Sequence, residues 1–336
     1  MGKLFKFLHK LDLNKLLLIA GITAAALLVA FLFWWQWGPN IIGIKNEDQK
    51  RPRASLTGLA CDNYARRPIA VMMASDPVAR PLSGISQADI VIEMPVTPNG
   101  ITRMMAIFQC EEPEEIGSIR SAREDFLTLA DAFGAIYVHW GGEEEALKKL
   151  NDGILDNINA MKYDGSVFYR KNSVPRPHNG FTTVELLTDK AKDLEYDLND
   201  MFSGYLRREE GSERSLSNIV ESVSIDYKSP YDVKWVYDAN LDIYKRIRGG
   251  TAEIDENTGK QVETNIVVLM HTVSGVLNLD YITVKTAGEG EAEFYQNGIK
   301  ISGMWKNIAN DLKFYDTDGQ EMKFIPGKMW IEIATK

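Results

Sequence analysis

The chain has 336 residues, of which 45% are hydrophobic and 10% aromatic, with 38 Lys and Arg against 47 Asp and Glu, two Cys and a formal net charge of −9. This composition excludes an intrinsically disordered chain, which has too few apolar residues to offset chain entropy, and it excludes collagen-like and disulfide-dense scaffolds. The length predicts one or two globular domains.

The first feature along the chain is an uncharged apolar run over residues 16–37. As a helix rising about 1.5 Å per residue it is roughly 33 Å long, enough to cross the hydrocarbon core of a bilayer. Four Lys precede it within residues 1–15, and short basic tails stay on the cytoplasmic side. The sequence therefore predicts a single-pass signal anchor in the cell membrane, with a cytoplasmic tail over 1–15 and an extracytoplasmic C-terminal part. The alternative is a cleaved signal peptide, which has a shorter apolar core.

Residues 38–55 contain Gly, Pro, Asn and charged residues without apolar periodicity, which is typical of a tether. Residues 1–37 carry a net charge of +3, so the remainder carries −12. A body this acidic argues against nucleic acid as a partner. In an oxidising compartment Cys61 and Cys110 can form a disulfide, and the alternative is two buried thiols.

The folded part begins near residue 56, and its first half mixes strands with helices. Short apolar runs bounded by Pro, Gly or Asn predict buried strands over 69–73, 90–94, 101–108 and 135–140. Apolar residues at helical spacing predict a helix over 122–133. A capping box of Thr182 and Glu185 predicts a second helix, which ends near residue 194.

A polar stretch with Gly and Ser over 203–218 predicts a domain boundary, so that one domain covers 56–205 and a second covers 219–336. In the second domain, alternating segments are separated by turn pairs such as Asn297-Gly298, which are typical of hairpins. The sequence therefore predicts an α+β protein with an N-terminal transmembrane helix, a mixed α/β first domain and a mostly β second domain.

Three arginines and a serine form the first candidate site. Ser121 and Glu124 have the spacing of a capping box, which predicts a helix start with Arg120 just before it and Arg123 in its first turn. Free N–H groups, the helix dipole and two guanidinium groups then meet at one point, which suits a phosphate or carboxylate. Arg103, on the preceding predicted strand, can add a third contact. The alternative is that these arginines pair with the many acidic neighbours.

A second candidate lies in the loop over residues 168–179, where prolines on both sides of Arg176 stiffen the backbone. The loop also carries Arg170, His178 and Asn179. Rigid loops with concentrated polar side chains are common places for ligand-binding residues. The alternative is a structural loop whose polar side chains bond to the backbone.

Asp89 and Glu93 lie four residues apart on an apolar strand, so alternation puts both on one side. Two such carboxylates can hold Mg²⁺ or act as acid and base. The alternative is that they are ion-pair partners of the arginines.

His139 lies within a hydrophobic strand and is predicted to be a core histidine. The chain has no zinc-ligand spacing, Walker loop, nucleophilic serine elbow or dinucleotide-binding glycine motif.

Several motifs in a fixed order resemble the YerB-like family of bacterial envelope proteins. They are RPIAVM at 67–72, PLSGISQADIVIE at 81–93, GITR at 100–103, IGSIRSAR at 116–123, PHN at 177–179, GMW at 303–305 and GKMWI at 327–331. The resemblance implies a two-domain extracytoplasmic protein, usually anchored as a lipoprotein, with no established activity. This chain differs in its protein anchor and in having Thr251-Ala252-Glu253 where the family pattern leads us to expect a Pro-His pair.

Three functions remain open from the sequence. The first is a membrane-anchored module that binds an anionic envelope ligand, bearing phosphate or carboxylate, through the arginines. The second is a Mg²⁺-dependent phosphotransferase or hydrolase acting on lipid-linked envelope glycopolymers, because the pattern is also distantly similar to LytR-CpsA-Psr phosphotransferases. In that case Asp89 or Glu93 holds the metal. The third is an envelope assembly factor that contacts a protein partner, with arginines that are only structural.

Overall fold

The structure is a computed structural model that describes residues 17–18, 20–34, 51–208 and 219–336. The chain separates into two compact units, one over residues 1–51 and the other over residues 52–336. The tail predicted over 1–15 and residues 38–50 of the tether predicted over 38–55 lie outside the described residues.

In the first unit, residues 17–18 and 20–34 are helical, and their side chains are exposed. Among the residues that the structure describes, no helix is both long enough and apolar enough to cross a membrane. The anchor predicted over 16–37 extends past the described part of this unit, since residues 16, 19 and 35–37 lie outside it.

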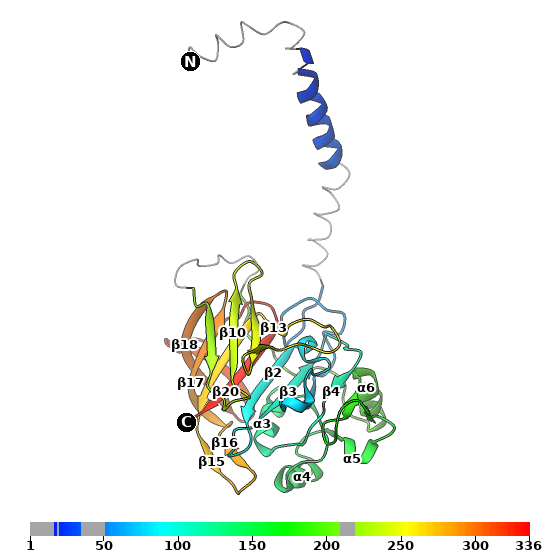
Figure 1. Cartoon of the computed structure of the whole chain (residues 1–336), viewed down its shortest axis with the longest axis vertical. Coiled ribbons are helices and arrows are strands. Elements are labelled where there is room, and N and C mark those ends of the chain that lie inside the picture. Colours follow the sequence, from blue (N-terminus) through cyan, green and yellow to red (C-terminus); the bar gives the residue numbers. More distant parts are fainter. Residues whose placement is uncertain (1–16, 19, 35–50, 209–218) are drawn as a thin grey trace. The chain divides into compact units, whose positions relative to one another are not determined.

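The first half of the second unit, cyan to green in Figure 1, mixes strands with helices. Its strands are β1 (Ile69–Ala74), β2 (Ile90–Pro95), β3 (Thr102–Phe108), β4 (Ile116–Gly117), β5 (Ile136–His139), β6 (Asn157–Asn159), β7 (Tyr169–Arg170) and β8 (Gly180–Thr182). Its helices are η1 (Pro77–Ala79), η2 (Ile85–Gln87), α3 (Glu124–Ala132), α4 (Glu144–Asn151), α5 (Ala160–Tyr163) and α6 (Val184–Asp193). The four strands predicted from apolar runs are confirmed as β1, β2, β3 and β5.

The second half, yellow to red in Figure 1, is almost entirely β. Its strands are β9 (Ser222–Ile225), β10 (Val233–Asp238), β11 (Ile243–Arg248), β12 (Thr251–Ala252), β13 (Glu263–Thr264), β14 (Ile266–Thr272), β15 (Ser274–Val276), β16 (Ile282–Val284), β17 (Gly288–Gln296), β18 (Ile299–Ile308), β19 (Asp311–Asp316) and β20 (Met329–Thr335). Asn297 and Gly298 join β17 to β18 with positive φ angles of 53° and 73°, so the predicted hairpin turn is confirmed.

The two halves share one sheet. Its ten strands run in the order β19-β18-β17-β14-β20-β2-β3-β1-β5-β6. The strand β20 lies between β14 of its own half and β2 of the first half, parallel to both. A second sheet, β12-β11-β10-β9 with β13 beside β11, belongs to the second half alone. The mixed α+β character predicted from the sequence is confirmed, but the halves are joined by continuous strand pairing.

Both faces are buried in the central strands of the ten-stranded sheet, from β14 through β20, β2, β3 and β1 to β5. In β14, Val268 and Met270 belong to one apolar core, and Val267 and Leu269 belong to another. The first core includes the inner side of α3, and the second includes α6 and the five-stranded sheet. Strands buried on both faces read as continuous apolar runs, which is why the sequence located them.

The second predicted helix starts one residue later than its capping box implied. Its N-cap is Thr183, whose hydroxyl accepts the N–H of Leu186. Thr182 lies in β8 and donates its hydroxyl to the carbonyl of Val167. The capping box of Thr182 and Glu185 is therefore wrong, because strand pairing extends through Thr182 before the helix begins.

Cys61 and Cys110 form a disulfide across a sequence separation of 49 residues. The bond ties the start of the folded unit to the segment that follows β3. Of the two alternatives left open by the sequence, the disulfide is confirmed, and it fits an oxidising compartment.

Replacement of both Cys61 and Cys110 by Ser is expected to lower the free energy of unfolding by about 2–4 kcal/mol, because the unfolded chain regains the freedom of a long loop. Denaturant unfolding of the two proteins measures this difference. The native protein treated with reductant is the matched control and should lose the same amount. Equal stability of all three samples would contradict the prediction.

Candidate functional site

Arg120 lies on an extended segment between β4 and α3. Its N–H donates to the carbonyl of Met72 in β1 at 2.8 Å, and its carbonyl accepts the N–H of Trp140, just after β5, at 2.9 Å. Ala122 forms a parallel bridge with Gly142. The segment therefore crosses the carboxyl ends of the parallel strands β1 and β5, and it places Arg120 and Arg123 there.

The start of α3 differs from the prediction. The helix begins at Glu124, and its N-cap residue Arg123 has no capping side chain. The capping box of Ser121 and Glu124 is wrong, because Ser121 belongs to the extended segment. Instead, Oε1 of Glu143 accepts the N–H of Glu124 at 2.6 Å. A carboxylate from the protein thus already occupies the helix start, so free N–H groups do not make an anion site there.

The predicted arginines nevertheless meet beside this helix start. We call Asp76, Arg103, Arg120, Arg123 and His178 the arginine cluster. Nη1 of Arg103 is 3.3 Å from Oδ2 of Asp76, and Nδ1 of His178 is 3.8 Å from the same oxygen. In the described part of the chain, no other carboxylate lies within 4.0 Å of either side chain. Asp76 also attracts the charge of Arg120, and Arg103 lies close enough to Arg120 and Arg123 to be repelled by both.

Arg123 has a weaker carboxylate contact and an aromatic one. Its Nε is 4.0 Å from Oε2 of Glu143, and its guanidinium lies 4.5 Å from the centre of the Tyr281 ring. A cation over an aromatic face is attracted by the ring quadrupole. This packing holds Arg123 without fully neutralising it.

Burial lowers the pKa values of Arg103, Arg120 and His178 in the cluster. Burial is the main cause that lowers the pKa of Arg103, and the charge of Arg120 lowers it further, while Asp76 opposes both. Burial also lowers the pKa of Arg120, against the attraction of Asp76. Burial and then Arg120 lower the pKa of His178 below its usual value, so its imidazole is neutral at neutral pH.

Three guanidinium N–H groups of the cluster have no acceptor. The Nε atoms of Arg103, Arg120 and Arg123 are buried and make no hydrogen bond. A buried donor without an acceptor costs about 1–3 kcal/mol. Within the described residues, the side chain of Arg120 also makes no ion pair. Arg120 is therefore the cation of the cluster that an external anion would satisfy best.

A pocket of about 300 Å³ lies next to Arg120, and we call it the loop pocket. It is lined by Ile119, Arg120, Ser121, Trp140, Met161, Arg170, Arg176 and Pro177. Three of these side chains are guanidinium groups, supplied by the segment before α3 and by the Pro-rich loop. No carboxylate lines the pocket.

Arg170 is held in place on the pocket wall. Its Nε donates to Oδ2 of Asp164 and its Nη1 donates to Oδ1 of Asn179, each at 2.9 Å. Its guanidinium lies 4.0 Å from the centre of the Trp140 ring. Arg176 is exposed and has no ion pair among the described residues. The pocket thus combines one fixed arginine, one exposed arginine and the unpaired Arg120.

The predicted ligand-binding residues therefore fall into three groups in one region. Arg120, Ser121, Arg170 and Arg176 line the loop pocket, and Arg103, Arg123 and His178 lie in the cluster around Asp76. Asn179 positions Arg170. Sequence reasoning missed Asp76, which lies three residues after the strand predicted over 69–73, and Trp140, the last residue of the strand predicted over 135–140. Loops and strand ends are common positions for site residues.

The two carboxylates predicted to hold a metal have other roles. Oδ2 of Asp89 accepts the N–H groups of Gln109 and Cys110 at 2.6 and 2.9 Å. Burial raises the pKa of Asp89, and these two N–H groups oppose that rise. Glu93 is engaged by arginines instead. Among the described residues, no group of three or more His, Cys, Asp or Glu side chains is placed to hold a metal ion. The interpretation of Asp89 and Glu93 as a Mg²⁺ site is corrected accordingly, because protein donors already occupy them.

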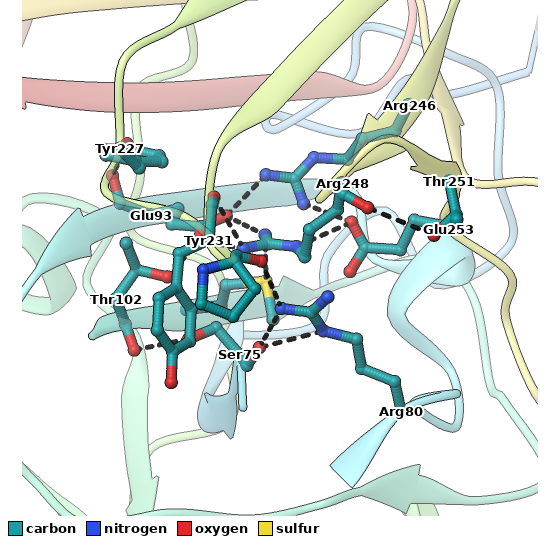
Figure 2. Close-up of polar contacts among 12 residues, drawn as sticks. Ser75, Arg80, Glu93, Thr102, Tyr227, Tyr231, Arg246, Arg248, Thr251 and Glu253 are labelled. Carbon is teal, nitrogen blue, oxygen red and sulfur yellow. Dashed lines mark hydrogen bonds and ion pairs between the residues drawn. The ribbon is translucent and has the colours of Figure 1, made fainter. Parts of the chain in front are cut away.

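Glu93 belongs to a second cluster, which we call the buried charge network: Glu93, Glu253, Glu332, Arg246 and Arg248. Arg246 contacts Glu93 at 2.5 Å, Glu253 at 2.7 Å and Glu332 at 3.0 Å. Arg248 contacts both oxygens of Glu93 and also Glu253, as Figure 2 shows. All five side chains are buried. The network joins β2 of the first half to β11 and β20 of the second half.

The network was missed because its members are far apart in sequence. Arg246 and Arg248 alternate along β11 and are both buried, so the available signal was two arginines spaced two residues apart among alternating apolar residues. Glu253, in the turn where the family pattern predicted a Pro-His pair, supplies an acceptor to both arginines.

His139 is buried and bonds to Gly141 and Asn157, so the prediction of a core histidine is confirmed.

Comparisons with known proteins identify the class to which the chain belongs. Residues 56–197 match the N-terminal domain, and residues 223–331 the C-terminal domain, of the family described as protein of unknown function DUF3048. The chain therefore belongs to this two-domain family.

The relatives confirm the resemblance to YerB-like proteins. The chain is 35% identical over 293 residues to the "Putative lipoprotein YerB" of Bacillus subtilis, covering 85% of this chain and 87% of the relative. The crystal structure of the Bacillus subtilis YerB protein superposes with a TM-score of 0.78 at 32% identity, covering 85% of this chain and 97% of that one. The fold is thus that of YerB.

Proposed function

We propose that this protein is a membrane-anchored extracytoplasmic protein whose loop pocket binds an anionic ligand of the cell envelope, bearing phosphate or carboxylate groups. The observation that carries the proposal is Arg120, which lines the pocket and has no hydrogen bond or ion pair for its side chain among the described residues. An oxyanion in the pocket would accept from this guanidinium and from Arg170 and Arg176.

The surroundings of Arg120 favour such a ligand. Arg120 lies close enough to Arg103 and Arg123 to be repelled by both, and Asp76 attracts it without forming an ion pair with it. Arginine binds phosphate and carboxylate through paired donors, and charge-assisted hydrogen bonds are roughly twice as strong as neutral ones. The pocket also lies beyond the carboxyl ends of parallel strands, where sheets of this kind commonly bind ligands.

Three observations support a membrane anchor over residues 16–37. The described helical residues 20–34 carry no charge, and large apolar side chains such as Leu27 (72% exposed) and Leu28 (62% exposed) are exposed. A helix that is apolar all round needs an apolar surrounding. The Cys61–Cys110 disulfide fits an extracytoplasmic compartment. The Bacillus subtilis relative is named a lipoprotein, and lipoproteins are held at a membrane.

The other two functions have less support. A Mg²⁺-dependent phosphotransferase or hydrolase needs a metal site, and Asp89 and Glu93 are occupied by backbone N–H groups and by buried arginines. No specific feature points to an envelope assembly factor with a protein partner. We therefore propose binding without turnover.

Replacement of Arg120 by Gln is expected to weaken the binding of inorganic pyrophosphate by about tenfold or more, because it removes the charge-assisted hydrogen bonds of the pocket. The full chain in a mild detergent is titrated with pyrophosphate by isothermal calorimetry, at low and at high salt. Affinity should fall as salt rises.

The matched control is Lys192→Gln, which removes one positive charge from an exposed side chain of α6 and should bind pyrophosphate like the native chain. The proposal fails if the native chain does not bind pyrophosphate, or if both variants bind it equally well.

A further inference from the structure

A separate cavity lies between the segment after η1 and the strands β11 and β12. Its volume is about 430 Å³, which is in the range of small-molecule sites and far above the roughly 30 Å³ of one water. Arg80, Pro81 and Leu82 form one wall, and residues 248–254 form the other. We call it the seam cavity, because its walls come from the two halves of the second unit.

Glu253 gives the seam cavity a carboxylate with one unused oxygen. Oε2 accepts from Nη1 of Arg246 at 2.7 Å and from Nε of Arg248 at 3.0 Å. Oε1 is buried and accepts no hydrogen bond. Burial alone would raise the pKa of Glu253, but Arg248 and Arg246 outweigh burial and lower it, so the group is ionised. An ionised buried oxygen without a donor gains free energy when a donor reaches it.

Arg80 gives the same cavity a cation without a carboxylate partner. Its Nε and Nη2 donate to the carbonyl of Ser75 at 3.0 and 2.7 Å, and Nη2 also approaches the carbonyl of Pro230 at 3.3 Å. Nη1 makes no hydrogen bond, and within the described residues no Asp or Glu forms an ion pair with Arg80. Figure 2 draws no contact between Arg80 and Glu253. The two opposite charges therefore line the cavity without satisfying each other.

The remaining lining is mostly apolar. Pro81, Leu82, Ala252 and Ile254 contribute the apolar part, with Leu82 buried and Ile254 38% exposed. The other two lining residues are Thr251 and Arg248, and the guanidinium of Arg248 is already paired with Glu93 and Glu253. A simple anion would be attracted to Arg80 but repelled by Glu253. A simple cation would be attracted to Glu253 but repelled by Arg80. A molecule with both charges and a small apolar group matches all three parts of the lining.

We propose that the seam cavity binds a small zwitterion of the amino-acid class, with its carboxylate on Nη1 of Arg80, its ammonium on Oε1 of Glu253 and its apolar side chain against Leu82 and Ile254. This site is distinct from the loop pocket, which has three arginines and no carboxylate in its lining. The two sites therefore select different ligands.

The test titrates the full chain in a mild detergent with leucine, using both enantiomers, and with two analogues that each lack one charge. Isocaproate lacks the ammonium group, and isoamylamine lacks the carboxylate. At least one enantiomer of leucine should bind at least tenfold more tightly than either analogue. Absence of leucine binding at millimolar concentration, or equal binding of leucine and an analogue, overturns the proposal.

Variants locate the site. Ala252→Trp fills the cavity from an exposed edge-strand position, leaves the buried charge network intact and should abolish leucine binding. Arg80→Met should weaken leucine binding at least tenfold. Arg120→Gln, in the loop pocket, should leave leucine binding unchanged, so failure of the two proposals can be told apart. Leucine binding that survives Ala252→Trp overturns the assignment to this cavity.

Discussion

Deletion of residues 327–336 is expected to prevent folding of the second unit. These residues contain β20, which pairs with β14 over seven residues and with β2 over four. Without β20, the ten-stranded sheet has a gap in its middle, and backbone groups of both neighbours lose their partners in a buried layer. Ile331 and Ile333 are fully buried, and removal of such side chains costs about 2–5 kcal/mol each. These two side chains alone account for about 4–10 kcal/mol, which is comparable to the whole stability of a typical domain, and the lost strand pairing adds to it.

The measurement is the soluble yield of the truncated chain and its unfolding profile by circular dichroism. A matched control removes residues 277–280, the tip of the β15–β16 hairpin, where Leu277 is 52% exposed and Leu279 is 94% exposed. That protein should fold and unfold cooperatively. A truncated chain that melts like the native protein would show that β20 does not hold the two halves together.

The position of β20 shows what the sequence could and could not predict. A mostly β second domain made of alternating segments was predicted, and β20 is one of its strands. Its neighbours were not predicted, because periodicity reports which faces of a strand are buried and not which strand lies beside it. The domain boundary expected at 203–218 was inferred from a change in local composition. Local composition carries no information on long-range pairing, and the sheet pairs β2 with β20, strands separated by more than two hundred residues.

In the candidate site, too, the sequence predicted local groupings of residues but not the contacts between distant segments. The sequence grouped Arg120 with Arg123 and Arg170 with Arg176 because each pair is local. It placed the helix start wrongly, because Glu143, which caps α3, comes from a later loop. Glu93 was considered as a metal ligand because the arginines that neutralise it lie more than 150 residues away.

Replacement of Glu93 by Gln is expected to lower the free energy of unfolding by about 3–5 kcal/mol, because it leaves Arg246 and Arg248 with too little negative charge in a fully buried place. The matched control is Glu289→Gln. Glu289 pairs with Lys306 at 3.0 Å but is 54% exposed, and exposed pairs contribute about 0–1 kcal/mol. Urea unfolding of both variants and the native chain measures the difference. Similar losses in the two variants would contradict the assignment of Glu93 as the centre of the network.

The network also predicts a pH dependence. Burial would raise the pKa of Glu93, but Arg248 and Arg246 outweigh burial and lower it from 4.5 to about 2. A carboxylate with a lowered pKa in the folded state stabilises the protein above its unfolded pKa, and this contribution is lost as the pH falls through the folded value. Burial raises the pKa of Glu332, so Glu332 retains a proton more readily than Glu93 or Glu253. The ionised Glu93 and Glu253 then balance the charges of Arg246 and Arg248.

Stability of the native chain should therefore fall as the pH drops from about 5 to about 2, and the part due to Glu93 is about 3 kcal/mol over that window. In Glu93→Gln that part should disappear, so the two unfolding curves should approach each other as the pH falls. Glu332 acts in the opposite direction, because a carboxylate with a raised pKa loses its stabilising contribution as the pH rises. Parallel pH profiles for the native chain and Glu93→Gln would show that the charge of Glu93 is not what holds the two arginines in the interior.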